Sequence, residues 1–290
     1  YDFNRWYGII RQLQPSATIA IMGPDVRWVG TESGVGREQE WSVIPADENM
    51  MEKIADGSQK DVAYAPKGDK MQKDLGSREK LANAKGLVWY PAETDVSIRP
   101  GWFYHATEDD KVKTPKQLLD IYFSSVGYNS VLLLNIPPDK NGLLAVNDVK
   151  SLEGFSGLLK KTFTNNLAQG ASVKCSNGIN TKALLDQAYS TYFTTKGNDT
   201  TTVIEFTLPT AKVVDVLSVQ ENISVGQRVE KFVLEYKDGA EWKQLAEGST
   251  IGYKRLLRFA PITAKVVRLR ILSSRLNPTL SSFGLYKLPE

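Results

Sequence analysis

The sequence predicts a multidomain protein in which a mixed α/β unit precedes an antiparallel β-sandwich of the jelly-roll type. Helical and strand patterns alternate up to about residue 162, as in the carboxyl-terminal part of a (β/α)8 TIM-like barrel. From Leu167 the helical period is lost, and short β-rich segments are separated by Gly, Pro, Asn and Asp. We therefore divide the chain into a partial barrel, residues 1–164, and a sandwich, residues 165–290.

The first elements alternate between helix and strand. Residues 1–13 carry apolar side chains at helical spacing, and Pro15 ends the predicted helix. Thr18–Met22 is a short apolar segment closed by a Gly-Pro pair, which predicts a buried strand. Residues 46–86 are polar and weakly periodic, so we expect a long surface excursion. Leu87–Tyr90 predicts a second strand.

The barrel-like alternation continues for three more elements. Thr114–Ser125 predicts a helix with Thr114 as its N-cap and proline in the first turn. Asn129–Ile136 is the most apolar run, and we expect a strand buried on both faces, as in a parallel sheet. Asp148–Lys160 predicts the last helix of this half. A closed barrel needs roughly 250 residues, so these units make only part of one.

The second half contains seven predicted strands and one hairpin turn at Lys237–Gly239. The strands are Thr202–Leu208, Val213–Gln220, Val229–Tyr236, Trp242–Ala246, Leu256–Phe259, Lys265–Leu272 and Leu280–Tyr286. Alternation places six apolar side chains inward: Val229, Phe232, Leu234, Val266, Leu269 and Ile271. Basic residues alternate with apolar ones, which predicts a solvated sheet face: Lys254, Arg255, Arg258, Lys265, Arg268 and Arg270.

Composition limits the chemistry to carboxylates. The 36 basic and 33 acidic residues give a net charge of +3, too small to indicate nucleic-acid binding. No apolar run reaches the roughly 20 residues of a membrane span, so no membrane insertion is expected. The single cysteine, Cys175, excludes an internal disulfide and a cysteine-based zinc site. The single histidine, His105, excludes any mechanism that needs two, and no G-x-S-x-G pattern occurs.

Two clusters of charged and aromatic residues follow predicted strands and suggest a site. The first follows Met22 and the second follows Tyr90. An aromatic side chain beside carboxylates gives a sugar ring a flat apolar platform with hydrogen-bond partners around it. The alternative is a pair of solvated loops whose aromatics pack on the body of the protein. For His105 a binding or structural role is preferred over direct proton transfer.

Four motifs in the first half carry a resemblance to the retaining α-L-fucosidase family of glycoside hydrolases, in particular to its branch preferring α-1,3 and α-1,4 linkages. They are GPDVRWVGTESG from Gly23, REQEWSV from Arg37, SIRPGWFYH from Ser97 and LLLNIPPDKNGLL from Leu132. The second half resembles a discoidin-like, galactose-binding-like sandwich, through LLDQAYSTYFTT from Leu184, QENISVGQRV from Gln220 and AKVVRL from Ala264.

The resemblance implies a nucleophilic carboxylate and a second, acid/base carboxylate about 5 Å apart. The family nucleophile is an Asp in a W-x-D-G-like strand end, and no such motif occurs in residues 1–290. The histidines that grip the fucose hydroxyls are missing as well. We therefore expect the nucleophile to lie upstream, in a remaining N-terminal part of the same enzyme. Without that part, we expect the chain to be inactive.

The resemblance assigns the acid/base role to Glu32, within a V-G-x-E-x-G segment. Thr31 departs from the family pattern, which commonly has Asn at this position. Glu38 and Glu40 are competitors that we expect to be structural, holding Arg37 or nearby backbone. We hypothesise that partial burial and a neighbouring carboxylate keep Glu32 protonated near neutral pH.

Six further residues are predicted to contact the substrate: Arg27, Trp28, Glu93, Arg99, Trp102 and His105. Structural ion pairs are an equal alternative for any one of the charged residues, for example Arg99 with Glu93 or Asp95. The expected substrate is a fucosylated oligosaccharide or glycoconjugate. A non-catalytic carbohydrate-binding protein is the alternative function, and a sandwich that serves only as a structural cap is a third hypothesis.

No cofactor and no metal ligands are predicted from the residues. The resemblance alone suggests a calcium ion stapling a sandwich loop, and no dense Asp loop of the EF-hand type supports it. The resemblance also leads us to expect a bacterial periplasmic or secreted protein.

Overall fold

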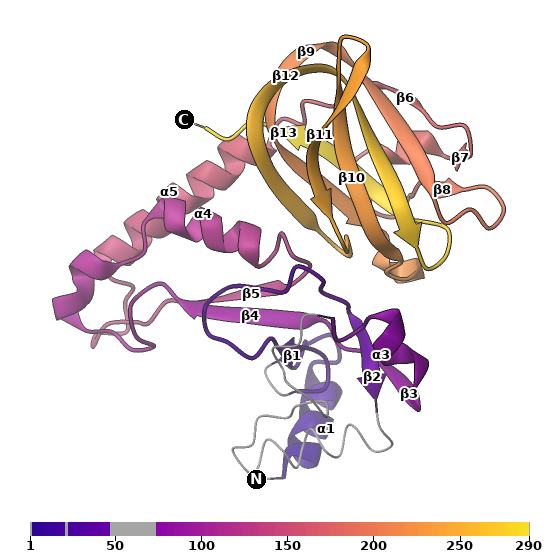
Figure 1. Ribbon diagram of the computed structural model, residues 1–290. Helices are drawn as coiled ribbons and strands as arrows, with labels where there is room; N and C mark the ends of the chain where they lie inside the picture. The colour runs from indigo at the N-terminus through magenta and orange to yellow at the C-terminus, as the bar shows by residue number, and fades with distance from the viewer. Residues whose placement is uncertain (1, 21–22, 47–73, 290) are drawn as a thin grey trace.

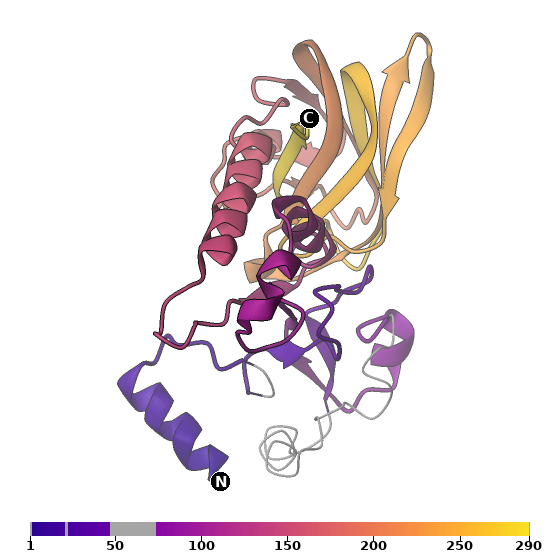
Figure 2. The same ribbon diagram turned by 90° about the vertical axis from the view of Figure 1, so that its left-hand side faces the viewer.

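The computed structural model describes residues 2–20, 23–46 and 74–289. Figure 1 shows a mixed α/β part below a domain made almost wholly of strands, and Figure 2 shows the same arrangement turned by a quarter. Most of the predicted surface excursion, residues 47–73, lies outside the described residues. We call residues 2–163 the α/β part and residues 166–289 the β domain.

A three-stranded parallel sheet forms the centre of the α/β part. Its strands are β1 (Arg27–Trp28), β4 (Ala92–Ser97) and β5 (Val131–Asn135), in the order β1-β4-β5. Trp28 pairs with Glu93, and Glu93 pairs with Val131. Side chains alternate between the two faces of a strand, so Glu93, Asp95 and Ser97 share one face of β4. The parallel order fits the expected barrel strands, while the closed barrel itself stays a prediction.

The predicted strand at Thr18–Met22 is wrong for its described residues, 18–20, which have no regular structure. The Ile19 backbone N–H donates to Asp25 Oδ2 at 2.7 Å, and the Asp25 N–H donates to the Ile19 carbonyl at 3.2 Å. Because both backbone groups of Ile19 are used in this local turn, they cannot join a sheet ladder. The preceding helix is confirmed as α1 (Phe3–Leu13), with Asp2 as its N-cap.

A two-stranded antiparallel sheet lies beside the parallel one. It consists of β2 (Val43–Ala46) and β3 (Gly86–Trp89), with the short helix α3 (Arg78–Ala82) before β3. The predicted strand at Leu87–Tyr90 largely coincides with β3, but the segment after it was misread. Ala92–Ser97 forms the central strand β4 and is not a loop, because its polar residues are inside the protein and paired by two neighbouring strands.

The two predicted helices that follow are confirmed. They are α4 (Pro115–Ser124) and α5 (Val146–Phe163), preceded by the short 3-10 helix η1 (Ala106–Lys111). Thr114 caps α4 in a reciprocal arrangement with Gln117. The expectation of a fully buried β5 is wrong for the described residues, since β5 is the edge strand and Val131 is 50% exposed.

The β domain is one antiparallel network in which two 20-residue strands, β9 and β12, pair along most of their length. The main strand order is β11-β10-β12-β9-β13, with β6 also paired to β9. The elements are β6 (Ser172–Lys174), β7 (Gly178–Ile179), η2 (Thr181–Leu184), β8 (Thr194–Thr195), β9 (Thr202–Glu221), η3 (Ile223–Val225), β10 (Val229–Asp238), β11 (Glu241–Gly248), β12 (Arg255–Ser274) and β13 (Leu280–Tyr286). Four predicted strands are therefore parts of two longer ones. Thr202–Leu208 and Val213–Gln220 both lie in β9, and Leu256–Phe259 and Lys265–Leu272 both lie in β12.

The core of the β domain agrees with the predicted alternation at five of six positions. Val229, Phe232, Leu234, Leu269 and Ile271 are at most 1% exposed. Val266 was predicted inward, but Val267 is the fully buried residue. The pairing of β12 with β9 shifts register between Ala264 and Val266, and such a bulge reverses which side chains face inward.

The predicted solvated basic face is wrong at its first residues, which pack on the α/β part. Arg255 is 3% exposed and lies over the Tyr128 ring, with its guanidinium carbon 4.5 Å from the ring centroid. Arg258 lies over Phe123 and pairs with Asp120. The start of β12 therefore forms an interdomain contact in place of a solvated face. Among the described residues, no helix is long and apolar enough to cross a bilayer.

Candidate active site

A buried acidic pair occupies one face of β4. The Trp28 indole N–H donates to Asp95 Oδ1 at 2.7 Å. Glu93 is 2% exposed, and its Oε1 has no hydrogen-bond partner among the described residues. Burial, and secondarily the charge of Asp95, raises the pKa of Glu93 to about 7. Burial also raises the pKa of Asp95, with a smaller contribution from Glu32.

Glu32 lies on the loop that follows β1, next to this pair. The loop is held by the Gly34 N–H, which donates to the Asp95 carbonyl at 3.0 Å. Gly34 has φ +70, and a Cβ there would come within 2.9 Å of Ile121, so glycine is needed for this approach. Glu32 Oε2 accepts a hydrogen bond from the Trp102 indole at 2.7 Å. The expected partial burial is wrong, because Glu32 is exposed and the described residues do not cover it.

Asn135, at the carboxyl end of β5, joins the same site from the third strand. Its side-chain amide donates to the Trp102 carbonyl at 3.0 Å and to Ser97 Oγ at 3.1 Å. The site therefore draws Glu32, Trp102 and Asn135 from the ends of three neighbouring strands. Sequence reasoning missed Asn135, although it is the first polar residue after an apolar run at a predicted strand end.

A second ionic cluster lies on the opposite face of the strands. Glu40 is 1% exposed and is paired with both Arg27 and Arg37, the latter at 3.2 Å. The Arg27 side chain also donates to the Tyr90 and Trp41 carbonyls. The prediction that Glu40 holds Arg37 is confirmed. Arg27 is directed away from Glu32 into this buried cluster, which favours the structural alternative for Arg27.

Arg99 is also buried among partners of the fold. Its side chain is 0% exposed and pairs with Asp148 at 3.0 Å and Asp109 at 2.8 Å. Its guanidinium lies 4.6 Å from the Tyr104 ring centroid. The suggested pairing of Arg99 with Glu93 or Asp95 is wrong, because Arg99 faces the start of α5. His105 is exposed at the surface, and its carbonyl accepts from Arg99.

The sequence-predicted substrate residues thus separate into two groups. Trp28, Glu93 and Trp102 gather around Glu32 and Asp95, whereas Arg27 and Arg99 are buried elsewhere. Within the described part of the chain, no cluster of three or more His, Cys, Asp or Glu could hold a metal ion.

Comparison with known proteins decides the family. The alpha-L-fucosidase sequence profile matches residues 22–162, the segment that contains Glu32, Glu93, Asp95 and Trp102. Residues 22–162 therefore belong to the alpha-L-fucosidase family. The F5/8 type C domain profile matches residues 168–283, so the β domain is a discoidin-like domain.

Relatives align with both domains of this chain. Alpha-L-fucosidase 1 of Arabidopsis thaliana is 37% identical over 99% of this chain and 54% of its own length. The chain thus spans about half the length of the curated relatives it matches. A Bacteroides ovatus crystal structure, described as that of a candidate alpha-L-fucosidase, is 41% identical, with a TM-score of 0.81 over 100% of this chain and 45% of that one.

A second solved structure is a Ruminococcus gnavus GH29 fucosidase in complex with fucose. It is 29% identical, with a TM-score of 0.82, and the match covers 100% of this chain and 58% of that one. The fold is accordingly that of a GH29 fucosidase followed by a discoidin-like domain.

Proposed function

We propose that this chain supplies the acid/base half of a retaining exo-α-L-fucosidase, which releases terminal α-1,3- or α-1,4-linked fucose from fucosylated glycans. One observation carries the proposal. Glu32 stands at the end of a parallel strand beside a tryptophan and a buried acidic pair, within the segment that the fucosidase profile matches. Carboxylates and aromatic rings in this arrangement suit glycoside cleavage.

In this proposal, Glu32 protonates the glycosidic oxygen as the bond to fucose breaks, and afterwards removes a proton from the attacking water. The Trp102 indole holds the carboxylate in place through its 2.7 Å hydrogen bond. Trp28 and Glu93 share the face of the sheet with Asp95 and contact the fucose. Trp102 offers its ring to the sugar, and exposed His105 is a peripheral contact.

The nucleophilic carboxylate is proposed to lie in the part of the relatives' length that this chain does not span. This is supported by the coverage of 54% of the Arabidopsis relative and by the lack of a W-x-D-G-like motif in the sequence. The chain alone would then bind glycan without cleaving it. By the same resemblance, we propose an exported bacterial enzyme.

The test uses a chain of the relatives' full length that contains residues 1–290. Glu32→Gln should abolish hydrolysis of fucosylated oligosaccharides, whose leaving groups need protonation, and should spare activated aryl fucosides. Glu38→Gln, on the same loop, is the matched control and should retain activity on both substrates. Equal activity of the Glu32 variant and the parent on oligosaccharides would refute the role of Glu32.

The alternative of a non-catalytic carbohydrate-binding protein makes a different prediction. In that case the full-length parent would bind fucosylated oligosaccharides and release no fucose. Fucose release by the parent, measured by chromatography, therefore separates the two functions.

A further inference from the structure

Trp102 stands on a segment without regular secondary structure, where its neighbours in sequence are open to solvent. Residues 98–105 connect β4 to η1 and contain no helix or strand. Phe103 is 77% exposed, and a Cβ at Gly101 would have no atom within 4 Å. Because packing around these neighbours is sparse, the position of Trp102 depends on hydrogen bonds.

Asn135, at the carboxyl end of β5, holds this segment at two points. Its backbone carbonyl accepts from the Ile98 N–H at 2.9 Å. Its side-chain amide donates to Ser97 Oγ at 3.1 Å and to the Trp102 carbonyl at 3.0 Å. Ser97 Oγ in turn donates to the Gly101 carbonyl at 2.6 Å. One residue of the neighbouring strand therefore closes the turn that presents Trp102.

The two acceptors around the Asn135 amide require a donor from that side chain. A carbonyl such as that of Trp102 can only accept, and the Ser97 hydroxyl already uses its single proton on the Gly101 carbonyl. The amide nitrogen supplies two N–H donors, whereas an ionised aspartate of the same shape supplies none. Asparagine is therefore needed at position 135 for its donors as well as for its size.

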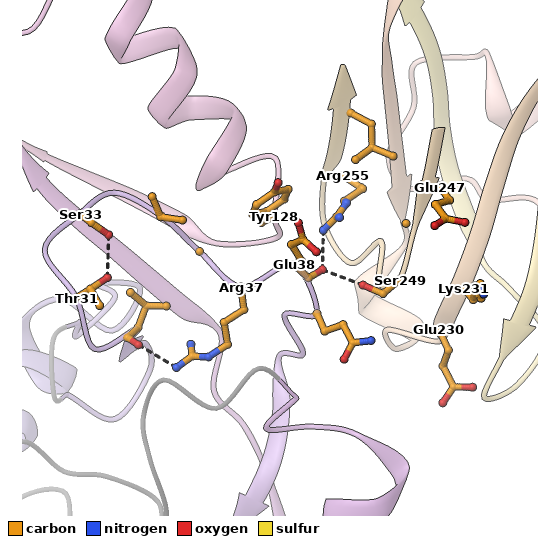
Figure 3. Close-up of a pocket in the computed structure, with 16 residues that line it drawn as sticks. Thr31, Ser33, Arg37, Glu38, Tyr128, Glu230, Lys231, Glu247, Ser249 and Arg255 are labelled. Atoms are coloured by element: carbon orange, nitrogen blue, oxygen red, sulfur yellow. Dashed lines mark hydrogen bonds between the residues drawn. The ribbon is translucent and has the colours of Figure 1, made fainter. Parts of the chain in front are cut away.

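The backbone of the Glu32 loop is fixed by hydrogen bonds of its own. Figure 3 shows Thr31 and Ser33, on either side of Glu32, with their hydroxyl oxygens joined by a 3.0 Å hydrogen bond. Arg37 closes the loop by donating to the Val29 carbonyl at 2.9 Å. Neither bond reaches the Glu32 carboxylate. In the described part of the chain, the hydrogen bond to this carboxylate comes from the Trp102 indole, at 2.7 Å.

We infer that Asn135 is a positioning residue for the Glu32 carboxylate and acts through Trp102. This role rests on the proposed function, which makes Glu32 the acid/base group. The contacts run from the Asn135 amide to the Trp102 carbonyl, and from the Trp102 indole to Glu32 Oε2. Loss of the first contact frees the indole to move, and a displacement of about 1 Å at a catalytic group can lower the rate about a hundredfold.

The test uses a chain of the relatives' full length that contains residues 1–290. Asn135→Ala should lower kcat/KM by about tenfold or more on a fucosylated oligosaccharide, whose leaving group needs protonation, and by less than about threefold on an activated aryl fucoside. Asn135→Asp, which keeps the shape and removes the donors, should show the same selective loss. Asn147→Ala is the matched control, because the Asn147 amide donates to the Asp109 carbonyl at 2.9 Å and does not bond to Trp102, and it should behave like the parent.

Two further measurements separate positioning from a general loss of structure. In a Trp102→Phe background, which keeps a ring and lacks the indole N–H, Asn135→Ala should change oligosaccharide hydrolysis by less than about twofold, because the contact that it serves is already absent. Fluorine NMR of protein labelled with fluorotryptophan reports on the indole directly. The Trp102 resonance, assigned by its absence in Trp102→Phe, should shift in Asn135→Ala and stay in place in Asn147→Ala.

Three results would overturn the inference: equal losses of Asn135→Ala on the two substrates, independent losses in the double variant, or an unchanged Trp102 resonance. Should Asn135→Ala fail to fold in a thermal unfolding control, Asn135→Asp decides by the same criteria. Absence of fucose release by the parent would instead refute the proposed function, while the Trp102 resonance would still test the contact with Asn135.

Discussion

Replacing Glu40 by glutamine should destabilise the α/β part strongly, because the Glu40 carboxylate is the shared counter-charge of two buried guanidiniums. Arg27, Arg37 and Glu40 are 6%, 8% and 1% exposed. At a separation of about 3 Å and an effective dielectric constant of about 20, each ion pair is worth ~5 kcal/mol before desolvation is counted. Glutamine keeps an acceptor oxygen but leaves two buried cations without an anion.

The expected net loss in the free energy of unfolding is ~3 kcal/mol, the lower end of what breaking a buried ion pair costs. The measurement is urea unfolding, followed by tryptophan fluorescence and circular dichroism to check that the transitions coincide. Glu38→Gln is the matched control on the same loop, since Glu38 is exposed, and should change stability by less than about 0.5 kcal/mol. If Glu40→Gln destabilises no more than Glu38→Gln, the assignment of Glu40 as a buried counter-charge is wrong.

Two further predictions concern the β domain. Burial raises the pKa of Glu221 from 4.5 to about 7, so the folded state binds the Glu221 proton more tightly than the unfolded state does. The contribution of this proton to the free energy of unfolding is therefore complete below pH 4.5 and is lost as the pH rises through 7. Unfolding measured at a series of pH values should therefore show that the free energy of unfolding falls by ~3 kcal/mol less in Glu221→Gln than in the parent between pH 4.5 and 7. Identical pH profiles of the two proteins would contradict the assignment. Phe283→Ala should cost about 4 kcal/mol, because Phe283 is fully buried and stacks on Phe206 with ring centroids 3.8 Å apart. Phe103→Ala, at a residue 77% exposed, should cost less than about 0.5 kcal/mol in the same unfolding assay, and equal losses in the two variants would count against the core assignment.

The sequence was sufficient to predict elements whose signals are local. Thr114 and the proline after it mark the start of α4 through capping, which depends only on neighbouring residues. The strands β10 and β13 follow from short-range alternation and flanking turn residues. Trp102 and Glu93 were named because polar and aromatic residues cluster where predicted strands end, whereas Glu32 was assigned by the resemblance of its segment to the α-L-fucosidase family.

Errors arose where distant residues decide the outcome. Ile19 lies in an apolar run, but both of its backbone groups are hydrogen-bonded to Asp25. The apolar pattern of a strand does not reveal these hydrogen bonds. Glu93 and Asp95 read as loop residues because carboxylates are rare in buried strands, and only the pairing of β4 with β1 and β5 shows that they are inside. Arg255 follows the alternation of a solvated face, yet its surroundings come from Tyr128, more than a hundred residues earlier.

The central claim is that Glu32 is the acid/base carboxylate of a retaining fucosidase. The most direct measurement is azide rescue of Glu32→Ala in a chain of the relatives' full length, using an activated aryl α-L-fucoside. If the claim is right, azide restores turnover and the product is α-L-fucosyl azide, because azide displaces the covalent fucosyl-enzyme with a second inversion. Recovery of β-L-fucosyl azide, or no rescue together with unchanged hydrolysis, would contradict it.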